Sequence, residues 1–346
     1  MVVRLEPIGR FPGLRVVAWV GGLLYAGRGY TLLRWEQDRA QWRQVAAMDP
    51  GGGRRLTVVH RLTLRLFRDG YHALAGLPDG RLAAVFPGVI GVLPPGASYF
   101  LPSCKVPRGT RPLALAATPA GHLFWGEYFD NARRDAVHVY GSADGGVSWE
   151  IVYTFPPGAI RHVHSVIYDA HAGCLWVLTG DEGSECRILR VSLDWSSVDT
   201  VLAGGQQTRL TTLVPRADAV YFATDTPFEE NHIYRLARNG HLECLGRVAG
   251  SSFWGCGVDR ALFFSTAVEP SAVNIGAQSI LYGSANERQW TALVHWTRDR
   301  WPSRFFQYPN IILPAGENRS DVLAATGVAV RGEDQVTHLW RVHTRA

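Results

Sequence analysis

Two histidines separated by one residue are the first candidates for chemistry in this chain of 346 residues. They lie in the segment Arg161-His162-Val163-His164. Because side chains alternate with period two along an extended strand, both imidazoles are expected on the same side. Such a pair can act as a general acid or base, hold a metal together with Asp181 or Glu127, or form ordinary hydrogen bonds. The sequence shows no complete ligand set, so no cofactor is predicted, and a divalent cation stays as an alternative.

Carboxylates and a tyrosine follow several apolar runs. Glu127 and Tyr128 come directly after the apolar residues 123–125, so both are expected where that strand emerges. A phenol beside a carboxylate can serve as a nucleophile or a proton donor, or can pack the rim of a channel. Matching positions in three successive repeats hold Asp181, Asp225 and Glu269. Facing carboxylates raise one another's proton affinity, as acid and base catalysis requires, although they can equally orient arginines.

A second set of residues suits recognition of a sugar. Guanidinium groups pair bidentately with a planar carboxylate, amides and acids bind hydroxyl groups, and an indole offers a plate for a pyranose ring. The alternative is that these loops are polar because they are exposed, and that the indole fills a central channel. The predicted binding residues are Arg28, Arg111, Arg161, Arg209, Glu230, Asn231, Trp254 and Glu269.

Units of four short strands that recur about every 45 residues would position these side chains. They cover 14–47, 71–101, 112–155, 163–202, 208–248, 252–295 and 310–342, the last with strands at 310–313, 322–326, 327–331 and 336–342. This period predicts an all-β fold, a single-domain β-propeller over 1–346 with seven four-stranded blades, six being the alternative. The last unit lacks a strong outer strand, so residues 2–8 are expected to pair there and close the ring.

One segment departs from this repeat. Residues 49–68 open with Asp-Pro-Gly-Gly-Gly and continue with mixed helical and strand spacing, which predicts an inserted short helix or a strap across one face. Its arginines are expected to form a solvated face.

The turn at 142–149 carries a motif. It reads Ser142-Ala143-Asp144-Gly145-Gly146-Val147-Ser148-Trp149, matching the Asp-box pattern S-x-D-x-G-x-[ST]-W. Here the chain resembles the Asp-box (BNR repeat) β-propellers of the sialidase-like superfamily. The resemblance implies a structural turn on one face and a functional funnel on the other. Sialidases use a tyrosine nucleophile and an F/Y-R-I-P arginine motif, and the latter is absent here. Eroded copies of the turn are expected at Ser192-Leu193-Asp194 and Ser284-Ala285-Asn286.

The loops of a propeller can be sorted by face. Connections from the second to the third strand of a blade, and from one blade to the next, emerge together, opposite the Asp-box turn. All the candidates above fall in such connections or at adjoining strand ends. The sequence therefore predicts a carbohydrate-active enzyme, a glycoside hydrolase or polysaccharide lyase, acting on a complex, uronate-containing bacterial polysaccharide. The alternative is a non-catalytic propeller that binds a glycan or a protein.

The charge and hydropathy of the sequence restrict the classes of partner that we expect. The net charge is +5, but the 35 basic residues are scattered among 30 acidic ones, which argues against a nucleic-acid partner. No apolar stretch has the length of a membrane span, and the N-terminus lacks the apolar core of a signal peptide. A cytoplasmic protein without a membrane partner is expected unless a leader has been removed, and oligomeric state is not predicted.

Overall fold

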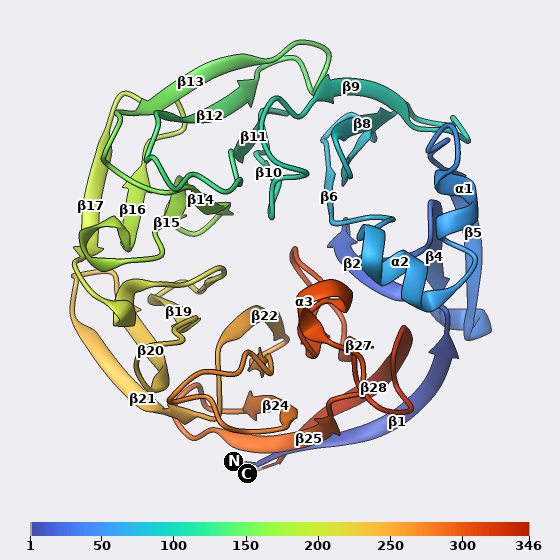
Figure 1. The fold of residues 1–346 in the computed structure, drawn as a ribbon. Coiled ribbons are helices and arrows are strands. Elements are labelled where there is room, and N and C mark those ends of the chain that lie inside the picture. The colour runs from blue at the N-terminus through green and yellow to red at the C-terminus, as the bar shows by residue number, and fades with distance from the viewer. Residues whose placement is uncertain (1, 346) are drawn as a thin grey trace.

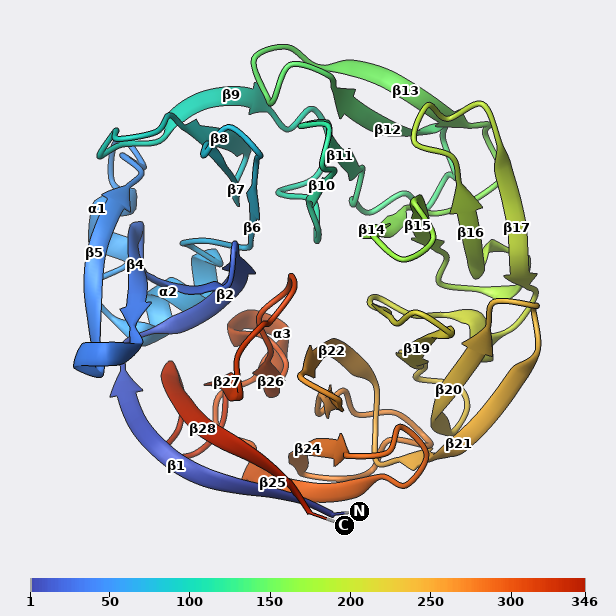
Figure 2. The same cartoon turned by 180° about the vertical axis from the view of Figure 1, so that it is seen from behind.

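Seven antiparallel four-stranded sheets are arranged in a ring (Figures 1 and 2), and residues from all seven line a central channel. The structure, a computed structural model, describes residues 2–345. The predicted seven-bladed β-propeller is therefore confirmed, and the alternative of six blades is wrong.

The blades follow one another along the chain, each with its first strand at the channel. The first has β2 (Arg15–Val20), β3 (Leu23–Arg28), β4 (Thr31–Glu36) and β5 (Gln41–Ala47), and the second has β6 (Ala73–Gly76), β7 (Leu82–Phe86), β8 (Val89–Leu93) and β9 (Leu101–Lys105). The third has β10 (Ala116–Ala117), β11 (Leu123–Gly126), β12 (Val137–Ser142) and β13 (Glu150–Phe155), and the fourth has β14 (Val163–Asp169), β15 (Cys174–Thr179), β16 (Arg187–Val191) and β17 (Val198–Ala203). The fifth has β18 (Val214–Pro215), β19 (Ala219–Ala223), β20 (Asn231–Ala237) and β21 (Leu242–Val248), and the sixth has β22 (Ser252–Val258), β23 (Ala261–Thr266), β24 (Gln278–Ser284) and β25 (Thr291–Thr297). Single 3₁₀ turns lie at Gln37–Arg39, Gly183–Glu185 and Gln206–Thr208.

The second strand of each blade is covered on both faces by neighbouring blades. All residues of β7, β15, β19 and β23 are buried, whereas the outer strand β13 is largely exposed or half-buried. Strands buried on both faces read as continuous apolar runs rather than as an alternation. The core is therefore a set of blade-to-blade interfaces arranged around the ring.

The N-terminal strand closes the ring. In the seventh blade, β26 (Asn310–Ile312), β27 (Val322–Val328) and β28 (Val336–Arg345) are completed by β1 (Val2–Pro12), which pairs with β28 from Val2 opposite Arg345 to Pro12 opposite Val336. The two ends of the chain lie side by side (Figure 1). The predicted closure is confirmed, but the strand expected at 327–331 is wrong, since β27 ends at Val328 and a turn follows.

The turn at 142–149 is held by its own side chains. The amides of Val147 and Ser148 donate to Asp144 Oδ1, both at 2.9 Å, and the amide of Gly146 donates to Ser142 Oγ at 2.7 Å. Gly146 has φ +89°, and a Cβ there would lie 2.7 Å from Val92 Cγ2, so only glycine fits. The Ser148 hydroxyl, helped by the amides of Ser148 and Val147, lowers the pKa of Asp144 well below its ordinary value. The motif therefore has a structural role.

Related turns occur at both of the predicted places. Ser192 Oγ donates to Asp194 Oδ1 at 2.6 Å, and the amide of Ser196 donates to the same oxygen at 3.1 Å. Ser284 Oγ donates to Asn286 Oδ1 at 3.2 Å. The three turns join the third and fourth strands of their blades, so the repeat places them on one face.

Residues 49–68 form two short helices, α1 (Arg54–Thr57) and α2 (Arg61–Phe67), and α2 packs near α3 (Ser303–Phe306), which lies in the connection from the sixth to the seventh blade. The expectation that all their arginines are solvated is wrong for Arg65, whose side chain is fully buried. Its Nη1 lies 2.6 Å from Asp299 Oδ2 and 3.1 Å from Asp334 Oδ2. The insertion is therefore tied to the seventh blade by a buried ion-pair network.

Within residues 2–345, no helix has the length and hydropathy that a membrane span requires.

Candidate functional site

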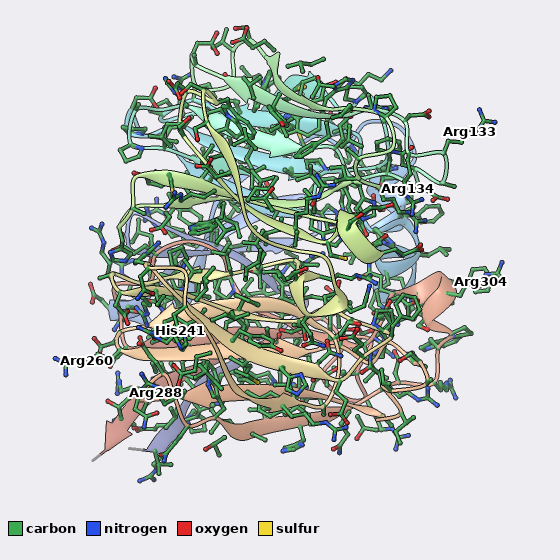
Figure 3. The ribbon with its side chains drawn as sticks, turned by 90° about the vertical axis from the view of Figure 1, so that its left-hand side faces the viewer. Arg133, Arg134, His241, Arg260, Arg288 and Arg304 are labelled. Carbon is green, nitrogen blue, oxygen red and sulfur yellow. The ribbon has the colours of Figure 1, made fainter. Side chains whose placement is uncertain are left out.

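The two faces of the ring differ in what they carry. The site face bears α1 to α3, the connections between blades and the connections from second to third strands, whereas the turn face bears the remaining hairpins. Figure 3 shows the faces edge-on, with Arg133, Arg134 and Arg304 projecting from one side and His241, Arg260 and Arg288 from the other. The predicted catalytic residues all belong to site-face connections or to the strand ends beside them.

A central channel of about 1510 Å³ runs through the ring and opens at this face. Several predicted site residues line it together, although they come from different blades. They are Arg111, Tyr128, His164, Arg209, Asp225, Trp254 and Glu269.

His162 and His164 meet Asp181 just below the channel mouth. The pairing of β14 with β15 shifts register between Val163 and Ser165, so His164 is the extra residue of a bulge. His162 Nε2 lies 3.0 Å from His164 Nε2, and the distances from these nitrogens to Asp181 are 3.4 Å to Oδ2 and 3.2 Å to Oδ1, respectively. The two imidazoles therefore lie on the same side of the chain, as predicted.

The δ nitrogens of both rings face backbone carbonyls. His162 Nδ1 lies 3.1 Å from Phe129 O, and His164 Nδ1 lies 2.9 Å from Leu210 O. A carbonyl oxygen only accepts, so each Nδ1 carries the proton and donates it. Neither histidine therefore has a nitrogen directed independently into the channel.

Asp181 is the common partner of four basic side chains. Besides the histidines, Arg161 Nη1 lies 3.3 Å from its Oδ2 and Arg209 Nη2 lies 3.3 Å from its Oδ1. Burial raises the pKa of Asp181, but hydrogen bonds from His162 and His164 outweigh it and leave the pKa well below its ordinary value. The carboxyl is ionised at neutral pH.

Its position depends on the preceding glycine. Gly180 has φ +132°, and a Cβ there would lie 2.6 Å from Cys186 Cα. Only glycine allows the chain to leave β15 at this angle and turn Asp181 toward the histidines.

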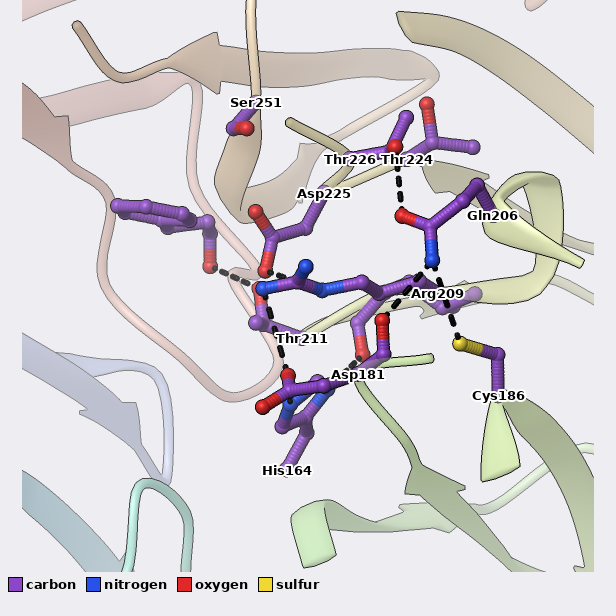
Figure 4. Close-up of polar contacts among 12 residues, drawn as sticks. His164, Asp181, Cys186, Gln206, Arg209, Thr211, Thr224, Asp225, Thr226 and Ser251 are labelled. Atoms are coloured by element: carbon purple, nitrogen blue, oxygen red, sulfur yellow. Dashed lines mark hydrogen bonds and ion pairs between the residues drawn. The ribbon is translucent and has the colours of Figure 1, made fainter. Parts of the chain in front are cut away.

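Arg209 lies between Asp181 and Asp225 (Figure 4), with Nε 3.8 Å from Asp225 Oδ2. Burial raises the pKa of Asp225 to about 7; Arg209 lowers it, and the nearby carboxylates of Glu269 and Asp181 raise it further. Glu269 accepts a hydrogen bond from Ser251 Oγ at 3.1 Å. Asp225 is therefore a carboxyl group that exchanges its proton near neutral pH.

The Tyr128 ring covers the histidine pair. Its centroid is 4.3 Å from that of His162 and 6.1 Å from that of His164. Burial raises the pKa of Tyr128, and the charges of Asp181 and Asp225 raise it further. The phenol keeps its proton at neutral pH and is suited to donate it.

Three more arginines line the channel. Arg15 begins β2, Arg68 ends α2 in a left-handed conformation, and Arg111 precedes β10; all three line the channel beside His72. Within residues 2–345, none of them pairs with a carboxylate. Burial lowers the pKa of Arg111 to about 9, and the charges of Arg68 and Arg15 contribute to that shift.

The sequence predicted only Arg111 of this trio. Arg15 could have been found, because it starts a first strand on the same face as Arg161 does, whereas Arg68 was assigned to the solvated insertion. The three guanidinium groups together present positive charge to the channel without internal neutralisation, which is an anion-binding arrangement.

Other predicted residues lie outside this assembly. Glu127 is fully buried; Arg108 donates to it from Nε at 2.8 Å and also from Nη2, and the amide of His138 donates at 2.9 Å. Asn231 is buried and holds the loop at Thr226, to whose carbonyl it donates at 2.9 Å.

The remaining two predicted residues are exposed. Glu230 pairs with Arg247 at 2.9 Å, and Arg28 lies at the end of β3 without lining the channel. None of these four predicted residues lines the channel. They are Glu127, Asn231, Glu230 and Arg28.

Comparison with known proteins supports the fold. No protein-family model and no curated protein sequence matches this chain. Among solved structures, the chain is similar to one in the "Crystal Structure of Mitotic Checkpoint Complex", with TM-score 0.60, 11% identity, and coverage of 98% of this chain and 95% of that one. It is also similar to the WD40 β-propeller domain of Doa1, with TM-score 0.57, 10% identity and coverage of 98% and 97%.

A GH74 xyloglucanase from Xanthomonas campestris is similar as well, with TM-score 0.55, 16% identity, and coverage of 85% of this chain and 47% of that one. The chain thus spans about half the length of that enzyme. At these identities the likeness shows the propeller fold alone, since this fold serves both enzymes and binding proteins.

Proposed function

We propose that this protein cleaves an acidic polysaccharide at the mouth of its channel. The observation that carries the proposal is the trio Arg15, Arg68 and Arg111, which has no carboxylate partner within the described chain and lines the same channel as Tyr128. A uronate carboxylate would satisfy these guanidinium groups. It would thereby bring the adjoining glycosidic bond toward the side of the mouth that carries proton-transfer groups.

Elimination suits this arrangement better than hydrolysis. In that reaction a base removes the proton on the carbon next to the carboxylate, the bond to the leaving oxygen breaks, a carbon–carbon double bond forms, and an acid protonates the leaving oxygen. Guanidinium groups on the carboxylate stabilise the charge that develops after proton removal. In the proposed assignment, Tyr128 protonates the leaving oxygen and Asp225 is the base, while Arg209 orients Asp225.

The test is a panel of acidic polysaccharides monitored for new reducing ends and for absorbance from unsaturated uronates. We expect both signals to rise together on at least one substrate, and neither on the same substrate after its carboxyl groups have been reduced to alcohols. Reducing ends without absorbance would indicate hydrolysis. Binding of the polysaccharide without either signal would favour the non-catalytic alternative.

Variants locate the site. Loss of one charge-assisted contact to the carboxylate costs about 1.5–3 kcal/mol, so Arg111→Met should lower kcat/KM about 10- to 150-fold. Arg133→Met is the matched control, because Arg133 is exposed on the same face and lies outside the channel (Figure 3). Equal effects of the two variants would refute the proposed carboxylate site.

A further inference from the structure

The cluster of His162, His164 and Asp181 contains an arrangement that proton transfer does not explain. Both Nδ1–H groups donate to backbone carbonyls, at 3.1 Å for His162 and 2.9 Å for His164. In a neutral imidazole the other nitrogen then carries a lone pair. When both rings are neutral, two Nε2 lone pairs face one another at 3.0 Å, and both also face the Asp181 carboxylate.

Three electron-pair donors that converge in a buried place repel one another unless something positive lies between them. The structure fixes all three from behind: a carbonyl holds each ring, and Gly180 sets the direction of Asp181. Histidines that bind metals characteristically donate their second N–H to a carbonyl or a carboxylate, which fixes the tautomer and aims the other nitrogen. We propose that His162, His164 and Asp181 form a binding site for one divalent transition-metal ion, with Zn²⁺ as the probe of choice.

The spacing of the donor atoms fits such an ion. The three donor groups lie within 4.8 Å of one another, with 3.0 Å between the two Nε2 atoms and 3.2 Å between His164 Nε2 and Asp181 Oδ1. For ligand bonds of about 2.1 Å, these separations correspond to angles of roughly 90–100° at the ion. Three ligands at such angles occupy one side of a coordination sphere and leave positions open on the other.

The three donor groups lie beside the channel. His164 lines the channel with Asp225 and Glu269, and the Tyr128 ring packs against His162 at 4.3 Å. An ion held here would offer vacant positions to water or to a ligand oxygen in the channel and would act as a Lewis acid there. Two imidazole nitrogens with one carboxylate favour ions such as Zn²⁺ or Fe²⁺ over Ca²⁺ or Mg²⁺, which prefer all-oxygen sites.

The surrounding charges accommodate a cation. Arg161 and Arg209 contact Asp181, but carboxylates outnumber the two guanidinium groups in their immediate neighbourhood. These carboxylates belong to Asp130, Asp181, Asp225 and Glu269. An ionised carboxylate has room for a metal on one lone pair and for an arginine on another, so the arginines act as outer partners of the ligand.

The metal site can be tested without any substrate. The result of this test is therefore independent of whether the proposed reaction occurs. Protein stripped with EDTA and dialysed is titrated with Zn²⁺ by calorimetry, and with Co²⁺ while its visible absorption is recorded. We expect one ion per chain, a Co²⁺ spectrum with nitrogen ligands, and a melting temperature that rises with Zn²⁺ concentration.

Asp181→Asn and His162→Gln should each weaken Zn²⁺ binding at least about 100-fold. The matched control is His241→Gln, since His241 is exposed on the turn face and should leave binding unchanged (Figure 3). If the variants do not fold, anomalous diffraction from wild-type crystals soaked in Zn²⁺ must place the ion between the two Nε2 atoms. No binding to the wild type, binding unaltered in folded variants, or an ion found elsewhere would overturn the proposal. Absence of binding would leave a proton shared by the two histidines as the explanation.

Discussion

The thermal stability of variants at Glu127 and Arg108 tests whether the Glu127 carboxylate has a structural role. Glu127 is fully buried, and its strongest partner is Arg108, whose side chain is 31% exposed. Replacing Arg108 with leucine leaves a buried carboxylate with only the amide of His138 as a donor. Removing one partner of a fully buried ion pair costs about 3–5 kcal/mol, and water reaching this half-open pair reduces the cost to about 2–3 kcal/mol.

That free energy converts into a shift of the melting temperature. At about 2.1 cal/mol/K per residue, the entropy of unfolding of 346 residues is about 0.7 kcal/mol/K. Arg108→Leu should therefore lower the melting temperature by about 3–4 °C in calorimetric scans at a fixed rate. Combining Arg108→Leu with Glu127→Gln removes both charges and should recover most of the loss. Arg133→Leu, a change at an exposed arginine, should have no effect.

The reasoning would be refuted if Arg108→Leu melted with the wild type, or if the double variant were as unstable as the sum of the single ones. Either outcome would mean that Arg108 does not stabilise the buried Glu127 carboxylate. The predicted catalytic role of Glu127 would then stay a prediction to be tested by activity measurements. A coupling energy between the two sites of about 1 kcal/mol or more would assign Glu127 to the architecture.

Three further outcomes follow from the fold. Removing residues 1–12 exposes the edge of β28, so oligomers and a lower melting temperature are expected in light-scattering and thermal experiments; a stable monomer would contradict the role of β1. Gly180→Ala forces a Cβ to within 2.6 Å of Cys186 Cα at φ +132°, and should cost about 1–3 kcal/mol in urea unfolding, whereas unchanged stability would mean that the loop relaxes freely. Burial raises the pKa of Asp169, but Arg238 and Trp176 outweigh it and leave a lowered pKa, so its stabilisation is full above about pH 4 and is lost as pH falls through the folded value. Asp169→Asn should therefore lose less stability than the wild type between pH 6 and pH 3, and equal losses would refute this assignment.

The convergence of the candidate cluster could be predicted because it depends only on topology. Tyr128, His162, His164, Asp181 and Asp225 lie far apart in sequence, but each occupies a connection type that a closed ring brings to one face. No side-chain geometry was needed for that inference. The turn motif at 142–149 set the register of the third blade, and the 45-residue spacing extended it to the others.

What the sequence could not predict depends on contacts between distant blades. Arg65 looks like one arginine among many in a polar insertion, and only the packing of α2 against the seventh blade places it between Asp299 and Asp334. The run after Gly327 has strand composition, yet Asp334 accepts the amide of Ala329 at 2.9 Å and folds that segment into a turn. In both cases tertiary contacts override the local pattern.

Positive and negative side chains occupy different parts of the channel mouth. Arg15, Arg68 and Arg111, which pair with no carboxylate within residues 2–345, come from the first blade, the insertion after it and the entry to the third, whereas the carboxylates and histidines come chiefly from the fourth to the sixth blade. In the proposed site, a ligand with one carboxylate would bind with its charge toward Arg111 and its next linkage toward Tyr128. Because the blades are separate sheets joined by packed interfaces, substitutions on one side should leave the other intact. Arg111→Met should then abolish selection for acidic polysaccharide while one Zn²⁺ still binds, and Asp181→Asn should abolish Zn²⁺ binding while the preference for acidic polysaccharide persists. A variant on either side that destroyed both properties would show that the mouth is one coupled network rather than two independent half-sites.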